Sequence, residues 1–308
     1  MHYQSFLRAA LGLLLLGSPG GLSLAGAQDE SENTVVEEGP QWVRLRNYKD
    51  IRRGSALDFS GQGLQHAPAG RYGWLKARGG TFEFEKKPGR ACRFYGVNLC
   101  FTANYPTHEV ADVLTDRLVR LGYNTIRIHH HDDTWNRGDA EMLDRLDYLL
   151  AQAMRKGLYV TTDMYVSRRV TWQELGVGRE GEVGMDLFKS LVGCYEPAFE
   201  NWCQFARRFM EHRNPYTGRQ YKDEPGMPLI SLINEGELFM GFDSKAGEPI
   251  IQQAYREFTG SDEKLEGWKG RFMDFQDYLE RRIAERCSAF LREIGCRALL
   301  TNDNNGFK

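Results

Sequence analysis

An amide and a carboxylate stand side by side at the end of one apolar run. Residues 229–233 read LISLI and lead directly into Asn234 and Glu235. An acid that follows an apolar strand is expected to have partly dry surroundings, a condition that favours the protonated form of a carboxyl group. Such an acid can protonate the leaving oxygen of a glycosidic bond, while a neighbouring amide holds a sugar hydroxyl. The pair therefore predicts Glu235 as a general acid acting on a sugar and Asn234 as a substrate-binding amide.

A second apolar run carries an arginine. In the stretch TIRIH, Arg127 and His129 share one face, while Ile126 and Ile128 take the other. A guanidinium on an inward face needs an anion, which is either a catalytic carboxylate or a structural partner within the fold. We expect Arg127 and His129 to line the cleft that also contains Glu235.

A third apolar run, LYVTTDMYV, ends with Asp163 and Tyr165. Both side chains are candidates for contacts with substrate hydroxyls. An internal ion pair is an equally good interpretation of Asp163.

The run HHHDD invites a metal interpretation. A metal-dependent hydrolase would use His129 and His131 together with further His or Lys ligands on later strands. His212 is the remaining histidine after this run, and it stands in the turn HRNPYTG, away from any predicted strand end. The pattern therefore favours a site without a metal or another cofactor.

Strand-like and helix-like segments alternate after Cys92. The predicted strands cover residues 92–99, 124–131, 158–166, 227–234 and 297–303. Predicted amphipathic helices separate them, at 107–122, at 139–157, around 199–210 and around 275–294. Longer insertions are expected at 167–196 and 236–270. Alternation of this kind predicts a parallel sheet with helices between its strands.

Two parallel architectures fit this alternation, the eight-stranded barrel and the open doubly wound sheet. No G-x-G-x-x-G motif follows the first predicted strand, which argues against the doubly wound dinucleotide fold. Polar residues follow successive strands, and barrel enzymes build their sites from those carboxyl ends. The sequence therefore favours an α/β fold of the (β/α)8 TIM-barrel class, with five of its strands present.

The first predicted helix has a well-marked start and apolar face. Thr107 is its expected N-cap, and Gly122 follows its end. The residues expected on its core-facing side are Val110, Val113, Leu114, Leu118 and Leu121.

The N-terminal region divides into three segments. Residues 1–27 have the basic start, short apolar core and small-residue site of a signal peptide, with cleavage expected after Ala27. Residues 28–40 form an acidic leader, and 41–90 form a small β-structure with a turn at Pro88–Gly89. Residues 91–308 are then the partial barrel. We expect a secreted or periplasmic protein that is not held in a membrane after cleavage.

Composition narrows the choice of partners. The 40 Lys and Arg residues nearly balance the 42 Asp and Glu residues, which argues against a nucleic-acid partner. Six cysteines in an exported chain permit disulfides, but buried free thiols fit equally well. The expected partner is an oligo- or polysaccharide.

Four motifs together resemble glycoside hydrolase family 5, the cellulase- and mannanase-like branch of the clan A enzymes. They are FYGVNL, LGYNTIRIHHHD, HRNPYTG and LISLINEGEL. The resemblance implies a (β/α)8 barrel and retaining hydrolysis of a β-linked glycan. It implies Glu235 as the acid/base, Asn234 as its neighbouring amide and Arg127 as the arginine that supports the nucleophile, whereas His129 and Asp163 match loosely.

One family feature has no counterpart in the printed sequence. The nucleophile of the family is a Glu after the seventh strand, whereas Lys308 follows soon after the fifth predicted strand. We expect an N-terminal part of a longer enzyme, with the nucleophile beyond Lys308. Glu237 and Asp163 are the internal alternatives. The main alternative function is a non-catalytic, carbohydrate-binding degenerate barrel.

Overall fold

The computed structural model describes residues 39–42, 51–236, 238, 248–267 and 269–302. The predicted signal peptide and most of the acidic leader lie outside these residues. The chain divides into two units, residues 1–49 and 50–308. In the first unit, the described residues form a short turn closed by a bridge between Gly39 and Trp42. The second unit carries every helix and strand discussed below, none of which is long and apolar enough to span a membrane.

A five-stranded parallel sheet forms the centre of the second unit. Its strands are neighbours in their order along the chain, with parallel pairing throughout. They are β4 (Gly96–Cys100), β5 (Thr125–His129), β6 (Tyr159–Asp163), β7 (Leu229–Ser231) and β8 (Leu299–Thr301). Consecutive parallel pairing is the order of strands in a (β/α)8 barrel. The predicted α/β class, with five barrel-type strands, is confirmed.

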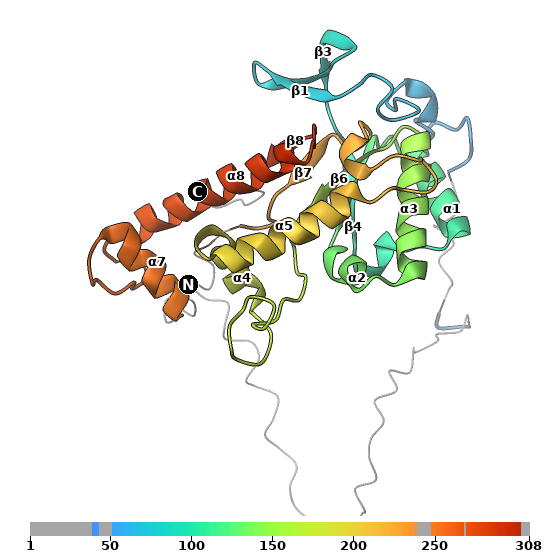
Figure 1. Ribbon diagram of the computed structural model, residues 1–308. Helices are drawn as coiled ribbons and strands as arrows, with labels where there is room; N and C mark the ends of the chain where they lie inside the picture. Colours follow the sequence, from blue (N-terminus) through green and yellow to red (C-terminus); the bar gives the residue numbers. More distant parts are fainter. Residues whose placement is uncertain (1–38, 43–50, 237, 239–247, 268, 303–308) are drawn as a thin grey trace, which may run out of the picture. The chain divides into compact units, whose positions relative to one another are not determined.

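One long helix follows each of the first four strands of this sheet. These helices are α1 (His108–Arg120), α3 (Ala140–Arg155), α5 (Glu196–Glu211) and α8 (Phe272–Glu293). In the view of Figure 1 they follow one another from right to left in that order. Within the described residues, three shorter helices lie in the strand-to-helix segments, α2 (Asp132–Arg137), α4 (Met185–Cys194) and α7 (Pro249–Thr259). The two predicted insertions therefore contain α4 and α7. Short 3-10 turns occur at Ser60–Gln62, Phe101–Asn104 and Tyr221–Asp223.

Helix α3 shows how local sequence sets its ends. The Asp139 side chain accepts hydrogen bonds from the backbone N–H groups of Glu141 and Met142, at 3.0 and 3.1 Å, and so caps the first turn. Gly157 follows the last turn with φ of 90°, a conformation that favours glycine. A Cβ at Gly157 would also lie 2.8 Å from the backbone nitrogen of Ala67, so this position excludes larger residues.

Helix α1 buries only part of the face predicted for it, since Leu118 is buried and Leu114 packs against the core. Its N-cap, Thr107, is as expected. Val110 and Val113 are 54 % and 62 % exposed, however, and the buried positions include Ala111 and Leu118. Polar contacts with α3 fix this rotation of the helix, because the Nζ of Lys156 donates to the Oγ1 of Thr115 and the carbonyl of Asp112. The apolar pattern alone contained no information about these bonds.

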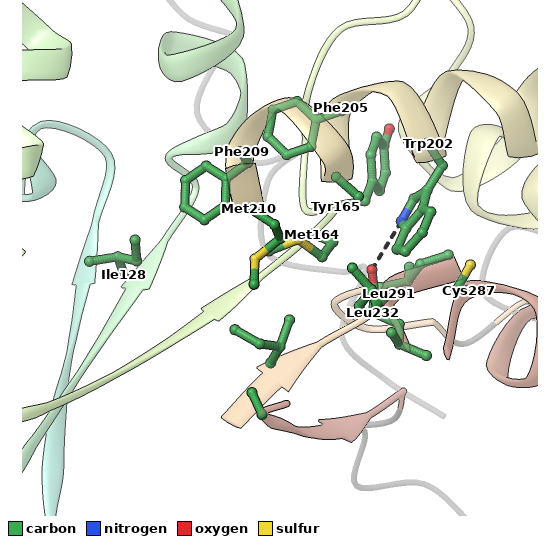
Figure 2. Close-up of a cluster of buried hydrophobic side chains, with 14 of the residues drawn as sticks. Ile128, Met164, Tyr165, Trp202, Phe205, Phe209, Met210, Leu232, Cys287 and Leu291 are labelled. Atoms are coloured by element: carbon green, nitrogen blue, oxygen red, sulfur yellow. Dashed lines mark hydrogen bonds between the residues drawn. The ribbon is translucent and has the colours of Figure 1, made fainter. Parts of the chain in front are cut away.

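The main core lies between the sheet and its helices. Figure 2 shows aromatic side chains of α5, including Trp202 and Phe209, next to Met164 and Leu232 from the segments that follow β6 and β7. The indole Nε1 of Trp202 donates to the carbonyl of Leu232 at 3.2 Å. Burying an aromatic side chain stabilises the fold by roughly 1.5–3 kcal/mol. This packing therefore holds the segment after β7 against α5.

The small antiparallel sheet packs at the end of the large sheet where its strands begin. It comprises β1 (Leu75–Arg78), β2 (Thr81–Phe84) and β3 (Lys87–Cys92). The ring of Phe84 stacks on that of Tyr159, the first residue of β6, with centroids 5.0 Å apart. The small sheet therefore lies away from the carboxyl ends of the parallel strands.

Two predicted boundaries in this region are wrong. Pro88 and Gly89 lie inside β3, where the register shifts, and the backbone N–H of Gly89 donates to the Oε2 of Glu83 at 2.7 Å. Pro88–Gly89, a dipeptide typical of turns, thus forms an irregularity within β3. The carboxylate that accepts the Gly89 N–H belongs to the neighbouring strand β2. Cys92 likewise ends β3, and the first parallel strand begins at Gly96.

The six cysteines are free thiols, and Cys203, Cys287 and Cys296 are buried.

Candidate functional site

Arg127 is the centre of a polar network at the carboxyl ends of three strands. Its Nη2 donates to the Oδ1 of Asp163 at 2.7 Å, and its Nε donates to the Oδ2 at 3.2 Å. The same Nη2 lies 2.7 Å from the Oδ1 of Asn234. The ring Nδ1 of His129 contacts the Oδ2 of Asp163 at 3.0 Å. One guanidinium thereby links β5, β6 and the segment after β7.

Asp163 is the internal anion of this network. Its side chain is fully buried, and burial alone would raise its pKa. The hydrogen bonds from His129 and Arg127 outweigh burial and hold the pKa of Asp163 below its ordinary value. The structural ion pair considered for Asp163 and Arg127 is therefore the arrangement found. Asp163 has no exposed surface for the alternative contact with a substrate hydroxyl.

The predicted acid lies in the turn after β7. The backbone N–H of Asn234 donates to the carbonyl of Tyr165 at 2.9 Å, and the Asn234 side chain is buried. Glu235 has φ of 46° and is exposed. This exposure differs from the partly dry surroundings expected from LISLI. Amide and acid thus belong to one turn, and the amide is fixed by Arg127.

A buried lysine that the sequence did not single out supports this turn. The Nζ of Lys189 donates to the backbone carbonyl of Glu235 at 3.2 Å and lies 3.3 Å from the Oδ1 of Asp186. Lys189 is only 2 % exposed. It comes from α4, inside a segment predicted as an insertion without a recognisable pattern. Its contact with Glu235 spans 46 residues of sequence, which explains why no local signal revealed it.

Tyr165 does not line an open cleft. It is fully buried, its hydroxyl donates to the carbonyl of Arg168 at 3.3 Å, and its ring packs against Phe188. The expected substrate contact of Tyr165 is replaced by core packing against Phe188 of α4.

The three consecutive histidines differ in their surroundings. His129 contacts Asp163, whereas the Nδ1 of His130 contacts the Oγ of Ser167 at 2.9 Å. His131 is fully buried, and burial lowers its pKa. Within the described ranges, no three His, Cys, Asp or Glu side chains gather as metal ligands would. His129 and His131 therefore have different surroundings, the first paired with Asp163 and the second enclosed in the core.

Asp132 fixes the loop that follows β6. Its Oδ2 accepts hydrogen bonds from the backbone N–H groups of Val166, Ser167 and Arg168, at 2.9, 2.9 and 2.8 Å. Three donors on one carboxylate oxygen hold this loop beside the histidine run. The HHHDD motif thus contributes scaffold contacts to the site.

An exposed aromatic platform borders the site, and sequence reasoning missed it. Phe101 is 59 % exposed, and its ring stacks on that of His130 with centroids 4.3 Å apart and planes 15° apart. Both residues line an open groove of about 870 Å³, together with Tyr105, Asp133 and Arg169. Burial lowers the pKa of His130, which favours a neutral ring. A neutral stacked pair beside polar groups is suited to contact with the face of a sugar ring.

Backbone strain marks the same edge of the sheet. Among the described residues, positive φ at a non-glycine position occurs at Phe101, His130 and Glu235, with φ of 52°, 52° and 46°. Phe101 and His130 directly follow β4 and β5, and Glu235 follows β7. Such conformations are costly and tend to persist at functional sites. The strain independently points to the carboxyl ends of the strands.

Comparison with known proteins gives likenesses in fold. No protein-family model matches the chain, and no curated protein does. Among solved structures, the endo-1,4-beta-mannanase of Rhizomucor miehei is 14 % identical with a TM-score of 0.49, over 76 % of this chain and 61 % of that one. An endo-beta-1,4-mannanase of Thermotoga petrophila is 16 % identical, with a TM-score of 0.45 over 71 % of this chain and 44 % of that one.

A third similar structure is a glycoside hydrolase family 5 protein of Bacteroides vulgatus, 13 % identical with a TM-score of 0.37, over 77 % of this chain and 41 % of that one. It belongs to the family that the sequence motifs resemble. The chain spans less than two thirds of the length of each of these three structures.

Proposed function

We propose that this chain carries the acid/base side of a glycosidase site that hydrolyses O-glycosidic bonds in a β-linked glycan with retention of configuration. The observation that carries the proposal is the Asn234–Glu235 turn at the carboxyl edge of a parallel sheet, with its amide hydrogen-bonded to Arg127. Glycosidic cleavage needs a carboxylic acid that protonates the leaving oxygen, which Glu235 supplies, and a fixed neighbouring amide can bond the sugar 2-hydroxyl.

Each residue has a defined role in this mechanism. Glu235 donates its proton to the glycosidic oxygen as the bond from that oxygen to the anomeric carbon breaks, while a second carboxylate attacks the anomeric carbon. Glu235 then takes a proton from the water that displaces this carboxylate. Asn234 holds the neighbouring hydroxyl of the sugar, and Arg127 orients Asn234. Phe101 and His130 provide a face for a further sugar ring.

The second carboxylate must lie about 5–5.5 Å from the acid in a retaining enzyme. Asp163 is fully buried and bonded to two cationic or polar partners, which makes it a poor nucleophile. Glu237 lies outside the described residues. Of the two carboxyl groups that react, we therefore assign only the acid/base, Glu235.

The test separates protonation of the leaving group from the rest of the reaction. Wild type and Glu235→Ala are assayed on aryl β-glycosides with a very acidic phenol as leaving group, and on matched alkyl glycosides that need protonation. We expect the variant to lose at least about 10²-fold in kcat/KM on alkyl glycosides and far less on the aryl substrates, since general acid catalysis contributes on the order of 10²–10⁴-fold. Added azide should restore turnover by entering at the anomeric carbon.

The matched control is Glu200→Gln, which changes an exposed carboxylate on α5 and should leave all rates unchanged. Equal losses on both substrate classes in Glu235→Ala would contradict the role of Glu235 as proton donor. Saturable glycan binding without turnover by the longest natural product of the gene would instead establish a carbohydrate-binding protein.

A further inference from the structure

A buried arginine follows β6 without a carboxylate partner. Arg168 is 3 % exposed, and within the described part of the chain no acidic oxygen lies within 4.0 Å of its guanidinium. Its Nη2 donates to the Oδ1 of Asn201 at 2.8 Å, whereas its buried Nε has no hydrogen-bond partner. A buried cation left in this state is costly, so its surroundings need explanation.

Aromatic rings compensate only part of this cost. The guanidinium carbon lies 5.0 Å from the ring centroid of Phe205, and 5.7 and 5.8 Å from those of Phe188 and Tyr165. Contacts of this kind contribute on the order of 0.5–2 kcal/mol. Burial still lowers the pKa of Arg168, which shows that the charged form is incompletely stabilised.

Asp132 and Glu174 are the acids whose charges favour the charged form of Arg168, and both are hydrogen-bonded to other groups. The Oδ2 of Asp132 accepts from three backbone N–H groups, one of which belongs to Arg168 itself. The Oε2 of Glu174 accepts from the backbone N–H and the hydroxyl of Thr171, at 2.6 and 2.8 Å. Neither carboxylate forms an ion pair with the guanidinium, although both attract it from a distance.

The guanidinium borders a cavity rich in hydrogen-bond donors. This cavity, of about 460 Å³, lies between α2, α5 and the loop after β6. Its polar lining comprises Arg168, Arg207, Arg208, Asn136, Asn201, Gln204 and one carboxylate, that of Glu174. Arg208 is exposed at the cavity and donates to the Oδ1 of Asn136. The cavity shares no lining residue with the groove beside Phe101 and His130. It is therefore a separate site.

We propose that this cavity binds a small molecule or saccharide unit through an oxyanion, that is, a carboxylate, sulfate or phosphate group, with Arg168 as its counter-ion. The planar fork of an arginine matches such oxyanions, and a buried guanidinium binds them more strongly than an exposed one. Arg208 supplies a second cation at the cavity, and the amides of Asn136, Asn201 and Gln204 supply further donors. The bound anion neutralises the charge that the fold leaves unpaired.

The test measures anion binding and does not depend on hydrolysis. Thermal unfolding and isothermal titration are carried out at constant ionic strength with phosphate, sulfate or D-glucuronate replacing chloride, and with D-glucose as the neutral control. We expect one saturable site and a rise in Tm of about 3 °C or more at saturation, because a ligand that binds only the folded state stabilises it. Tighter binding of glucuronate identifies an acidic saccharide, and tighter binding of phosphate or sulfate identifies a free inorganic anion.

Two variants remove the proposed counter-ions. Arg168→Met keeps the packing against the rings and should abolish the saturable response. Arg208→Gln should weaken binding about tenfold, as expected for loss of one charge-assisted hydrogen bond. Arg213→Gln, an exposed arginine just past α5 and outside the cavity, should bind like wild type.

Absence of a saturable response to all three anions in the wild type would overturn the proposal. Unchanged affinity in Arg168→Met would do the same. If Arg168→Met does not fold, the anion affinities of Arg208→Gln and Asn201→Ala test the site, because both variants keep the buried Arg168. Wild-type affinity in both variants would then reject the site.

Discussion

Arg127 and Asp163 come from adjacent strands, and two hydrogen bonds of 2.7 and 3.2 Å join them side by side. The same guanidinium reaches Asn234, 107 residues further along the chain. Because one nitrogen of Arg127 serves both Asp163 and Asn234, the positions of β5, β6 and the turn after β7 are coupled. The predicted acid, Glu235, is positioned through this coupling.

The first prediction concerns the geometry of this guanidinium. Arg127→Lys keeps the charge but cannot form the paired bonds to Asp163 and reach Asn234 at the same time. We expect the free energy of unfolding to fall by about 2 kcal/mol, the value of a lost hydrogen bond between charged groups. Turnover of a β-glycoside should fall by roughly 10²-fold because Asn234 is no longer held in place. Denaturant unfolding and steady-state kinetics measure the two effects.

Arg213→Gln is the matched control for Arg127→Lys, since Arg213 is exposed and far from the network in sequence. A variant Arg127→Lys with wild-type stability and rates would show that the paired bonds do not position the site.

The second prediction concerns acid stability. The pKa of Asp163 is below its ordinary value of 3.8, because hydrogen bonds from His129 and Arg127 outweigh the effect of burial. The stabilisation from Asp163 is therefore complete above the unfolded-state pKa of about 3.9 and is lost as the pH falls through the lower folded-state pKa. Asp163→Asn removes this contribution, and the free energy of unfolding should change less steeply below pH ~4 than in wild type.

At neutral pH the same substitution should destabilise the protein by about 3 kcal/mol, since it leaves Arg127 without its anion. Removing one partner of a buried ion pair costs about 3–5 kcal/mol. We take the lower end of this range because the Arg127 side chain is 29 % exposed. Asp223→Asn, at an exposed pair with Lys222, should change stability by less than about 0.5 kcal/mol. Parallel acid titrations of wild type and Asp163→Asn would contradict the assignment.

The sequence determined the order of elements well, because apolar periodicity reports which residues face the core. It predicted all five parallel strands and the four long helices between them, though not α2, α4 or α7, and it placed Arg127, His129 and Asn234 on one edge. It missed the rotation of α1, where Val110 is exposed, because that rotation depends on polar bonds to a helix distant in sequence.

The contacts that fix the site were beyond local reasoning for the same reason. Lys189 reaches Glu235 across 46 residues, and the Phe101–His130 stack joins the ends of two strands. Neither pair has a spacing that a single sequence reveals. The prediction for Tyr165 was wrong because β6 ends at Asp163, and alternation along a strand does not predict that Tyr165 packs against Phe188 of α4.

The third prediction tests the aromatic platform. Phe101→Ala removes an exposed ring stacked on His130, so the fold should lose less than about 1 kcal/mol. If the ring holds a sugar, KM for a glycan several units long should rise roughly tenfold, the equivalent of about 1.4 kcal/mol, while KM for a small aryl glycoside stays unchanged. Phe82→Ala is the matched control, since Phe82 is also exposed but belongs to the small sheet. Equal KM values for the long substrate in wild type and Phe101→Ala would exclude the platform.

The last prediction separates the two contacts of Lys189. Its Nζ donates to the carbonyl of Glu235 at 3.2 Å and pairs with Asp186 at 3.3 Å. Lys189→Met removes both contacts and should lower kcat about tenfold or more, because the turn that carries Glu235 loses its support. Asp186→Asn removes only the ion pair, which is exposed on the Asp186 side, so kcat should remain within about twofold of wild type. If both variants lose activity equally, the ion pair is what matters and the bond to Glu235 is incidental; if neither does, Lys189 only fills space in the core.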